Sequence, residues 1–177
     1  MDEHELRRLM YTAQLPNKGP FVIRYPRGGG VLKDWRCPLE EVKVGTGRKM
    51  KDGDDVAVLS IGPIGNNVTE AIAQLSTVNC QLSTAHYDMR FLKPLDEQIL
   101  EEVGRKFKRI ITVENGARKG GLGSAVLEWM NDHDYHPTVT RLGFPDHFVE
   151  HGKVCELQNI VGIDAEAIKA AILGHQS

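Results

Sequence analysis

The chain has 177 residues, of which 41% are hydrophobic and 26% charged, a composition typical of one good-sized globular domain. Its 22 Lys and Arg face 24 Asp and Glu, so the net charge of −2 provides no basic field for a nucleic-acid backbone. No apolar run reaches the length of about 18 residues that a membrane span requires, and the charged start MDEHELRR is unlike a signal peptide. We expect a cytoplasmic protein without nucleic-acid or membrane partners, in which Cys37, Cys80 and Cys155 are reduced.

The first 30 residues predict one helix followed by one strand. Asp2 is a candidate N-cap, and Leu6, Leu9 and Met10 have the spacing of one helical face. The run PFVIRY is rich in β-forming residues and predicts a strand, whereas PRGGGVLKDWRCP has no sustained period and is expected to be a linker. Because one helix and one strand cannot bury their own faces, this piece must pack on the following domain or belong with something missing.

From Val42 onward, apolar β-type runs alternate with helical segments, which is typical of a parallel sheet covered by helices. The almost continuously apolar run 55–62 is expected in the sheet core, and the more polar run 42–50 at an edge. The expected strands are 42–50, 55–62, 82–89, 109–114 and 137–143, and the expected helices are 68–75, 95–107, 121–133, 153–161 and 164–173. We therefore predict an α/β domain with a mostly parallel sheet of about five strands.

Two histidine patterns suggest a metal site, but their contexts argue against it. HFVEH (147–151) fits the H-x-x-E-H pattern of zinc peptidases, yet it lies between Pro145 and Gly152, which leaves too little room for a rigid helix. His133 and His136 lie at an expected helix end, where capping and solvated residues are common. We expect no metal at either place.

The glycine-rich stretch ENGARKGGLGSAV lies between an expected strand and an expected helix. Backbone N–H groups at such a turn can bind an anion, which makes Gly120, Gly121, Gly123 and Ser124 candidate anion-binding residues. The alternative is structural: the glycines let the helix approach the sheet, and Ser124 caps its first turn. The spacing fits neither a P-loop nor a full dinucleotide fingerprint, so the structural interpretation is favoured.

Arg90 and Lys93, in DMRFLKPLDE, follow an expected strand at the sheet edge where α/β domains bind ligands. Arg90 is a candidate ligand-binding residue. An ion pair with Asp88, Asp96 or Glu97 accounts for an arginine at this position at least as well.

The stretch RYPRGGG (24–30) is a candidate phosphate-binding loop. Pro26 fixes one backbone angle, the glycines let a ligand approach, and guanidinium groups match phosphate oxygens. Arginines are also commonly solvated or paired with a carboxylate. These residues alone therefore leave phosphate binding and a structural role equally open, and no nucleophile motif is present elsewhere.

The chain resembles one enzyme family in six stretches, in this order: MDEHELRRLMYTAQ, GPFVIRYPRG, VGTGRKMKDGDDVAVLSIG, DMRFLKPLDE, TVENGARKGGLGSAV and RLGFPDHFVEHGK. They are similar to the C-terminal part of the 1-deoxy-D-xylulose-5-phosphate synthases, thiamine diphosphate-dependent enzymes of the transketolase type. The resemblance covers essentially the whole chain. YPRG combined with RFLKPLD and GGLGS is specific for this family, whereas GGxGS and PLD alone would indicate the wider superfamily.

The resemblance implies a transferase that uses thiamine diphosphate and Mg²⁺ to decarboxylate pyruvate. It joins the two-carbon unit to glyceraldehyde 3-phosphate, which yields 1-deoxy-D-xylulose 5-phosphate and CO2 for isoprenoid (terpenoid) and thiamine biosynthesis. The intact enzymes of the family are homodimers.

By resemblance, residues 1–30 are the tail of the pyrimidine-binding domain, 31–45 a linker, and 46–177 a three-layer transketolase C-terminal domain with helices on both faces of its sheet. Arg27 matches the arginine of the YPRG motif and is implied to contact the phosphate of glyceraldehyde 3-phosphate. No role is carried over to Arg24.

The family's diphosphate- and magnesium-binding stretch, GDG followed by an Asn-rich segment, does not occur in this chain, nor does the glutamate-bearing region that activates the thiamine ring. Since those parts position the cofactor, we expect this chain alone to be inactive, to bind neither thiamine diphosphate nor Mg²⁺, and to work with the rest of its own polypeptide. The alternatives are a free-standing anion-binding or regulatory α/β module that uses residues 120–124, and a zinc hydrolase that uses HFVEH.

Overall fold

The computed structural model describes residues 1–77 and 82–174, so Cys80 lies outside the described residues. Cys37 is half-buried, Cys155 is exposed, and both are free thiols, as predicted for them. No helix in the described part of the chain is long and apolar enough to cross a membrane. In chain order the elements are α1 (Glu3–Ala13), β1 (Arg48–Lys51), β2 (Val56–Ile61), α2 (Gly65–Thr77), β3 (Thr84–Asp88), α3 (Glu97–Lys106), β4 (Arg109–Ala117), α4 (Leu122–Asp132), β5 (Thr138–Phe144), α5 (Val154–Ile160) and α6 (Ala165–Leu173).

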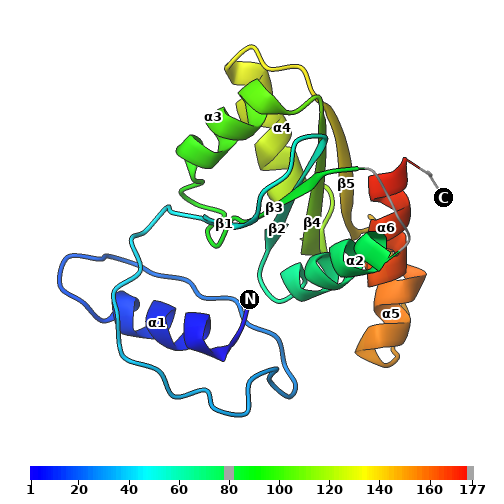
Figure 1. The fold of residues 1–177 in the computed structure, drawn as a ribbon. Helices are drawn as coiled ribbons and strands as arrows, with labels where there is room; N and C mark the ends of the chain where they lie inside the picture. Colours follow the sequence, from blue (N-terminus) through cyan, green and yellow to red (C-terminus); the bar gives the residue numbers. More distant parts are fainter. Residues whose placement is uncertain (78–81, 175–177) are drawn as a thin grey trace.

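The described strands form one five-stranded sheet in the order β1-β3-β2-β4-β5 (Figure 1). Strands β2 to β5 are parallel to one another, and Val58 of β2 lies between His86 of β3 and Ile111 of β4. Strand β1 pairs antiparallel with β3 at one edge. The mostly parallel five-stranded α/β sheet predicted from the alternating pattern is therefore confirmed.

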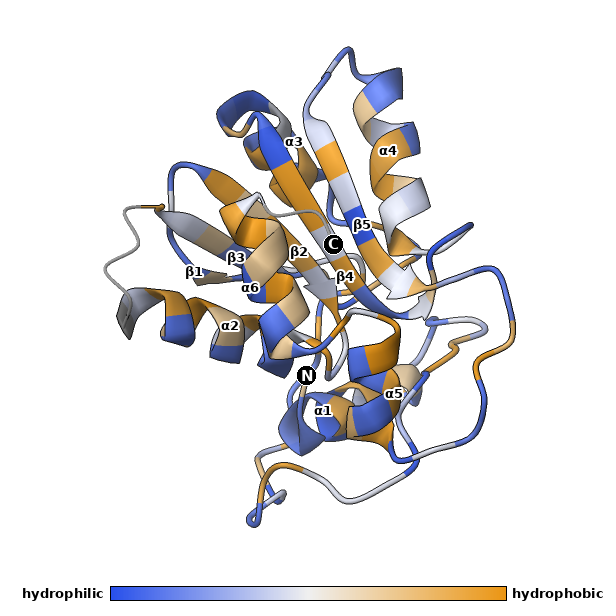
Figure 2. Cartoon of the chain, turned by 90° about the vertical axis from the view of Figure 1, so that its right-hand side faces the viewer, coloured by the Kyte–Doolittle hydropathy of each residue, from blue (hydrophilic) through white to orange (hydrophobic). Residues whose placement is uncertain are grey.

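Alternate residues of the central strand β2 face two different helix layers. Val56 and Val58 pack with α2 and α6 on one face, while Ala57 and Leu59 pack with α3 and α4 on the other, and all four are fully buried. Figure 2 shows the hydrophobic residues concentrated along the central strands between these helices. Because side chains alternate along a strand, one continuously apolar run supplies both cores, which confirms the predicted three-layer arrangement.

Helix α1 lies beyond the carboxyl ends of the parallel strands, and segment 14–47 runs around it (Figure 1). Asp2 caps the helix as predicted, because its Oδ1 accepts a hydrogen bond from the N–H of Glu5 at 2.9 Å. Thr12 Oγ1 accepts from the N–H of Val42 at 2.8 Å, and Asn66 donates to the carbonyl of Met1 at 3.2 Å. The N-terminal helix therefore packs on the α/β domain.

The strand predicted at 20–25 is wrong. The stretch belongs to no strand, and Val22 is almost fully exposed. A high β propensity stabilises a strand only through cross-strand pairs, and no described strand lies alongside this stretch.

The strand predicted at 42–50 is wrong except for its last residues. The N–H of Val42 binds Thr12, Gly45 has a φ of 78°, and the N–H of Gly47 donates to Asp96 Oδ2 at 2.7 Å. These contacts form turns, and the strand begins only at Arg48.

Candidate functional site

The candidate site is the edge of the sheet at which the parallel strands end and α1 lies across (Figure 1). In parallel α/β sheets, ligands bind outside the carboxyl ends of the strands. Arg90 and residues 120–124 follow the strands β3 and β4, and the loop of Arg27 is held near this edge by the contact of Phe21 with Phe91.

Arg27 lies on an exposed loop whose two ends are fixed. On one side, the ring of Phe21 packs edge-on against the buried Phe91 with ring centres 6.3 Å apart. On the other side, the N–H groups of Val31 and Leu32 each donate to the carboxylate of Glu3 at 2.9 Å, and these bonds lower the pKa of Glu3. Arg27 itself is exposed and makes no hydrogen bond or ion pair with any residue in 1–77 or 82–174. Its guanidinium is therefore free to bind an anion.

Arg24 points elsewhere. Its Nη1 lies 3.3 Å from the position that a Cβ on Gly116 would occupy, and Glu114 Oε2 lies 3.3 Å from the same position. The two arginines of the RYPRG stretch thus have different surroundings: Arg24 faces the end of β4, and Arg27 faces solvent.

The glycine turn before α4 binds a carboxylate of its own chain. The N–H groups of Leu122 and Gly123 donate to Glu114 Oε2 and Oε1 at 2.9 and 3.0 Å. A Cβ on Gly121 would lie 2.0 Å from Glu114 Oε2, so only glycine leaves room for this carboxylate. Glu114, and not the predicted Ser124, caps the first turn of α4.

The remaining contacts of the turn are also internal. Ser124 Oγ accepts from the N–H of Gly120 at 2.9 Å and from Arg141 Nη1 at 3.2 Å. A Cβ on Gly123 would lie 2.6 Å from Thr112 Oγ1, which fits a glycine required for close packing of the helix on the sheet. Anion binding at residues 120–124 stays a prediction, and an external anion would compete with Glu114 for the same N–H groups. The signal missed in the sequence was the acidic residue at the end of the strand before the turn.

A group of four charges, in which the carboxylates are buried and the arginines half-buried, joins α1 to the carboxyl edge. Glu5 of α1 accepts from Arg90 Nη2 at 3.0 Å and lies 3.3 Å from Arg48 Nη1, and Arg48 also bonds the buried Asp88 at 3.0 Å. Arg90 adopts a left-handed backbone with a φ of 56°, and its N–H donates to Asp88 Oδ1 at 3.3 Å. The ion pair considered for Arg90 thus exists, but its partner is Glu5, 85 residues away, and not a carboxylate in 88–97.

Ser60 and His86 form a second buried polar contact on the same face of the sheet as Asp88. His86 Nε2 and Ser60 Oγ are 2.8 Å apart. Burial, with a smaller contribution from the positive charge of Arg48, lowers the pKa of His86 from 6.5 to about 4. His86 is therefore neutral at physiological pH and acts as a hydrogen-bonding residue of the core.

The HFVEH stretch is not helical, since α5 begins only at Val154. His147, Glu150 and His151 line one open pocket together with Arg118. Within residues 1–77 and 82–174, no group of three or more His, Cys, Asp or Glu side chains is placed to hold a metal ion. The two histidines of this stretch do not share a helical face as they would in a zinc peptidase.

Comparison with known proteins identifies the fold. The model of the transketolase C-terminal domain matches residues 45–168. A solved structure described as the inactive beta4 tetramer of a split-gene transketolase superposes with a TM-score of 0.68 at 29% identity, covering 79% of this chain and 44% of that one.

Curated relatives match nearly the whole chain. The 1-deoxy-D-xylulose-5-phosphate synthase of Bacteroides thetaiotaomicron is 62% identical over 173 residues, which are 98% of this chain and 27% of that protein. The enzyme of Bacteroides fragilis is 59% identical over 172 residues, 97% of this chain and 26% of that protein. The chain thus spans about a quarter of the length of these relatives. It belongs to the transketolase C-terminal domain family, and over nearly its whole length it matches the C-terminal part of 1-deoxy-D-xylulose-5-phosphate synthases.

Proposed function

We propose that this chain is the C-terminal portion of a 1-deoxy-D-xylulose-5-phosphate synthase, which condenses pyruvate with glyceraldehyde 3-phosphate. The observation that supports this most strongly is the 62% identity that extends over 98% of the chain and thus includes the Arg27 loop, outside the matched domain model.

Arg27 is proposed to bind the phosphate of glyceraldehyde 3-phosphate. Its guanidinium is exposed, has no described partner and lies on a loop fixed by Phe91 and Glu3. A guanidinium can donate two parallel hydrogen bonds to phosphate oxygens, and a loop fixed at both ends loses less conformational entropy when the ligand binds.

The family's diphosphate- and magnesium-binding stretch does not occur in this sequence, so we propose that the remainder of the synthase holds thiamine diphosphate and Mg²⁺. Among the residues with described positions, no acidic cluster could hold the metal ion that the diphosphate requires. We therefore assign to this chain no step of the cofactor chemistry, and we propose that it is inactive unless joined to the remainder of the synthase. The inactive state named for the split-gene relative agrees with this proposal. Dimer formation by the complete enzyme is part of the same proposal.

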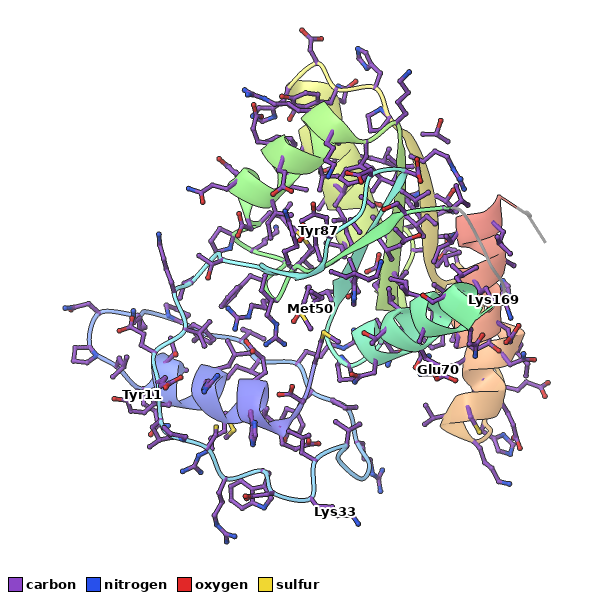
Figure 3. All side chains as sticks on the ribbon, in the orientation of Figure 1. Tyr11, Lys33, Met50, Glu70, Tyr87 and Lys169 are labelled. Atoms are coloured by element: carbon purple, nitrogen blue, oxygen red, sulfur yellow. The ribbon has the colours of Figure 1, made fainter. Side chains whose placement is uncertain are left out.

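Arg27→Ala tests the assigned role in a chimera in which this chain replaces the matched C-terminal part of the Bacteroides thetaiotaomicron enzyme. Loss of a charge-assisted hydrogen bond costs about 1.5 to 3 kcal/mol, so the Michaelis constant for glyceraldehyde 3-phosphate should rise roughly 10- to 150-fold. The Michaelis constant for pyruvate should hardly change. Lys33→Ala is the matched control, because Lys33 is an exposed cation of the same segment whose side chain points to solvent (Figure 3). Equal increases for both substrates would refute a phosphate-binding role.

A further inference from the structure

The first turn of α1 carries two carboxylates that bind different parts of the chain. Glu5 is buried and pairs with Arg90 of the α/β domain at 2.9 Å. Glu3 instead binds the N–H groups of Val31 and Leu32, in the segment that runs around the helix. Residues two positions apart on a helix point to different sides, so the first turn of α1 lies between the domain and this segment.

Both carboxylate oxygens of Glu3 are used in its contact with the loop. Oε1 accepts from the N–H of Val31 and Oε2 from the N–H of Leu32, each at 2.9 Å. These bonds hold the pKa of Glu3 below its usual range, and the bond from Leu32 is the largest cause. Because two neighbouring N–H groups hold one carboxylate, they fix the backbone that begins four residues after Arg27.

Gly30 leaves the space that the Glu3 carboxylate needs. A Cβ on Gly30 would lie 1.9 Å from Glu3 Oε1 and 2.4 Å from the carboxyl carbon, whereas a Cβ on Gly28 or Gly29 would meet no atom within 4 Å. The backbone of Gly30 does not have a positive φ. An alanine at position 30 would therefore be hindered by Glu3 and not by its own backbone.

We propose that Glu3 is a positioning residue for the phosphate of the aldehyde substrate, acting through the backbone of residues 27–32. The proposal rests on the proposed function of Arg27. Glu5 fixes α1 on the domain, and Glu3 in turn fixes the loop that carries Arg27. A ligand binds with an apparent affinity that is reduced by the fraction of molecules in the binding geometry. Glu3 thereby increases the preference for a phosphorylated over a non-phosphorylated aldehyde.

Glu3→Gln in the chimera with the Bacteroides thetaiotaomicron enzyme tests this role, because glutamine accepts through one oxygen only and carries no charge. The Michaelis constant for glyceraldehyde 3-phosphate should rise about 3- to 10-fold, less than for Arg27→Ala, since the arginine itself remains. The catalytic rate and the Michaelis constants for pyruvate and for D-glyceraldehyde, the same aldehyde without the phosphate, should change less than about twofold. An equal increase for D-glyceraldehyde would overturn the proposal.

Glu40→Gln is the matched control, because Glu40 is an exposed carboxylate of the same segment that pairs with Arg8 of α1. This variant should leave all three Michaelis constants unchanged. Gly30→Ala should displace the Glu3 carboxylate and raise the constant for glyceraldehyde 3-phosphate to an extent similar to that of Glu3→Gln, although Glu3 is still present.

The double variant Arg27→Ala, Glu3→Gln separates positioning from a general loss of stability. In a chimera that already lacks Arg27, Glu3→Gln should have no further effect, since the ligand that it positions is gone. A further increase of more than about threefold would overturn the proposal. If Arg27→Ala raises the Michaelis constant for glyceraldehyde 3-phosphate and Glu3→Gln does not, the role of Glu3 alone is refuted. If Arg27→Ala has no effect, the proposed function of Arg27 is refuted.

Discussion

At the scale of single residues, Glu114 explains why the turn before α4 needs its glycines. Its carboxylate accepts from two helix N–H groups, at the end where the helix dipole favours negative charge. Gly121 provides the space, because a Cβ there would meet Glu114 Oε2 at 2.0 Å and the carbonyl of Ala117 at 2.4 Å. One buried acid of β4 therefore binds the start of α4.

Gly121→Ala should lower the free energy of unfolding by about 1 to 3 kcal/mol, because the added methyl group displaces Glu114 and leaves buried N–H groups without a partner. Urea denaturation of the wild type and the variant measures the difference. Gly29→Ala is the matched control, since a Cβ on Gly29 would meet no atom within 4 Å. Equal stabilities of the two variants would show that the hydrogen bonds of Glu114 do not require a glycine at position 121.

The neutral state of His86 predicts how stability depends on pH. Its pKa in the folded chain is about 4, against 6.5 ordinarily, so the unfolded chain takes up the proton first as the pH falls. The contribution of neutral His86 to the free energy of unfolding is fully present above about pH 6.5. It is lost as the pH falls from about 6.5 to 4, by up to about 3 kcal/mol.

Denaturation midpoints of the wild type and His86→Gln between pH 4 and 8 check this dependence. Glutamine can still hydrogen-bond Ser60 but does not titrate, so the variant should lose less stability toward pH 4 than the wild type. Parallel curves would mean that His86 does not cause the pH dependence of stability.

At the scale of secondary structure elements, the contact between α1 and the domain depends on the Glu5, Arg90, Arg48 and Asp88 group. Buried charges are stable only when they are paired, and removal of one partner leaves the others uncompensated. Glu5 is the member that α1 contributes, so we expect this residue to contribute most to holding the helix on the domain.

Glu5→Gln should therefore increase hydrogen exchange of the α1 amides by roughly tenfold or more, while the amides of β2 stay protected. Mass spectrometry of the exchanged peptides measures both. Glu40→Gln is the control, because the pair between Glu40 and Arg8 is exposed and contributes about 0 to 1 kcal/mol. Unchanged exchange in α1 would mean that other contacts, such as Thr12 with Val42, suffice to hold the helix.

The elements that the sequence predicted correctly are those whose pattern is local. The apolar run of β2 and the Asp2 cap of α1, which accepts from the N–H of Glu5 at 2.9 Å, can be read from a few neighbouring residues. The stretch 20–25 was mispredicted because strand formation depends on a partner strand, which no local pattern reveals.

The same distinction applies to the candidate site. Arg27 and the glycine turn could be found from motifs, but the pairing of Arg90 with Glu5 joins residues 85 positions apart. Glu114 was missed because it reads as the last residue of a buried strand, and only the folded turn brings its carboxylate to the N-terminus of α4.

At the scale of the whole molecule, the chain is a transketolase C-terminal domain that also carries a docked helix and a loop with a free arginine. The domain provides the platform, the charge group fixes α1 on it, and Glu3 of α1 fixes the loop of Arg27. The proposed function requires that this arrangement be completed by the remainder of a synthase.

The most direct test is whether the chimera with the Bacteroides thetaiotaomicron enzyme forms 1-deoxy-D-xylulose 5-phosphate from pyruvate and glyceraldehyde 3-phosphate. With 62% identity over the exchanged part, the catalytic rate should lie within about tenfold of the parent enzyme, while this chain alone should form no product. A folded chimera that binds thiamine diphosphate but forms no product, or product formed by the isolated chain, would contradict the proposal that this chain is the C-terminal portion of a synthase.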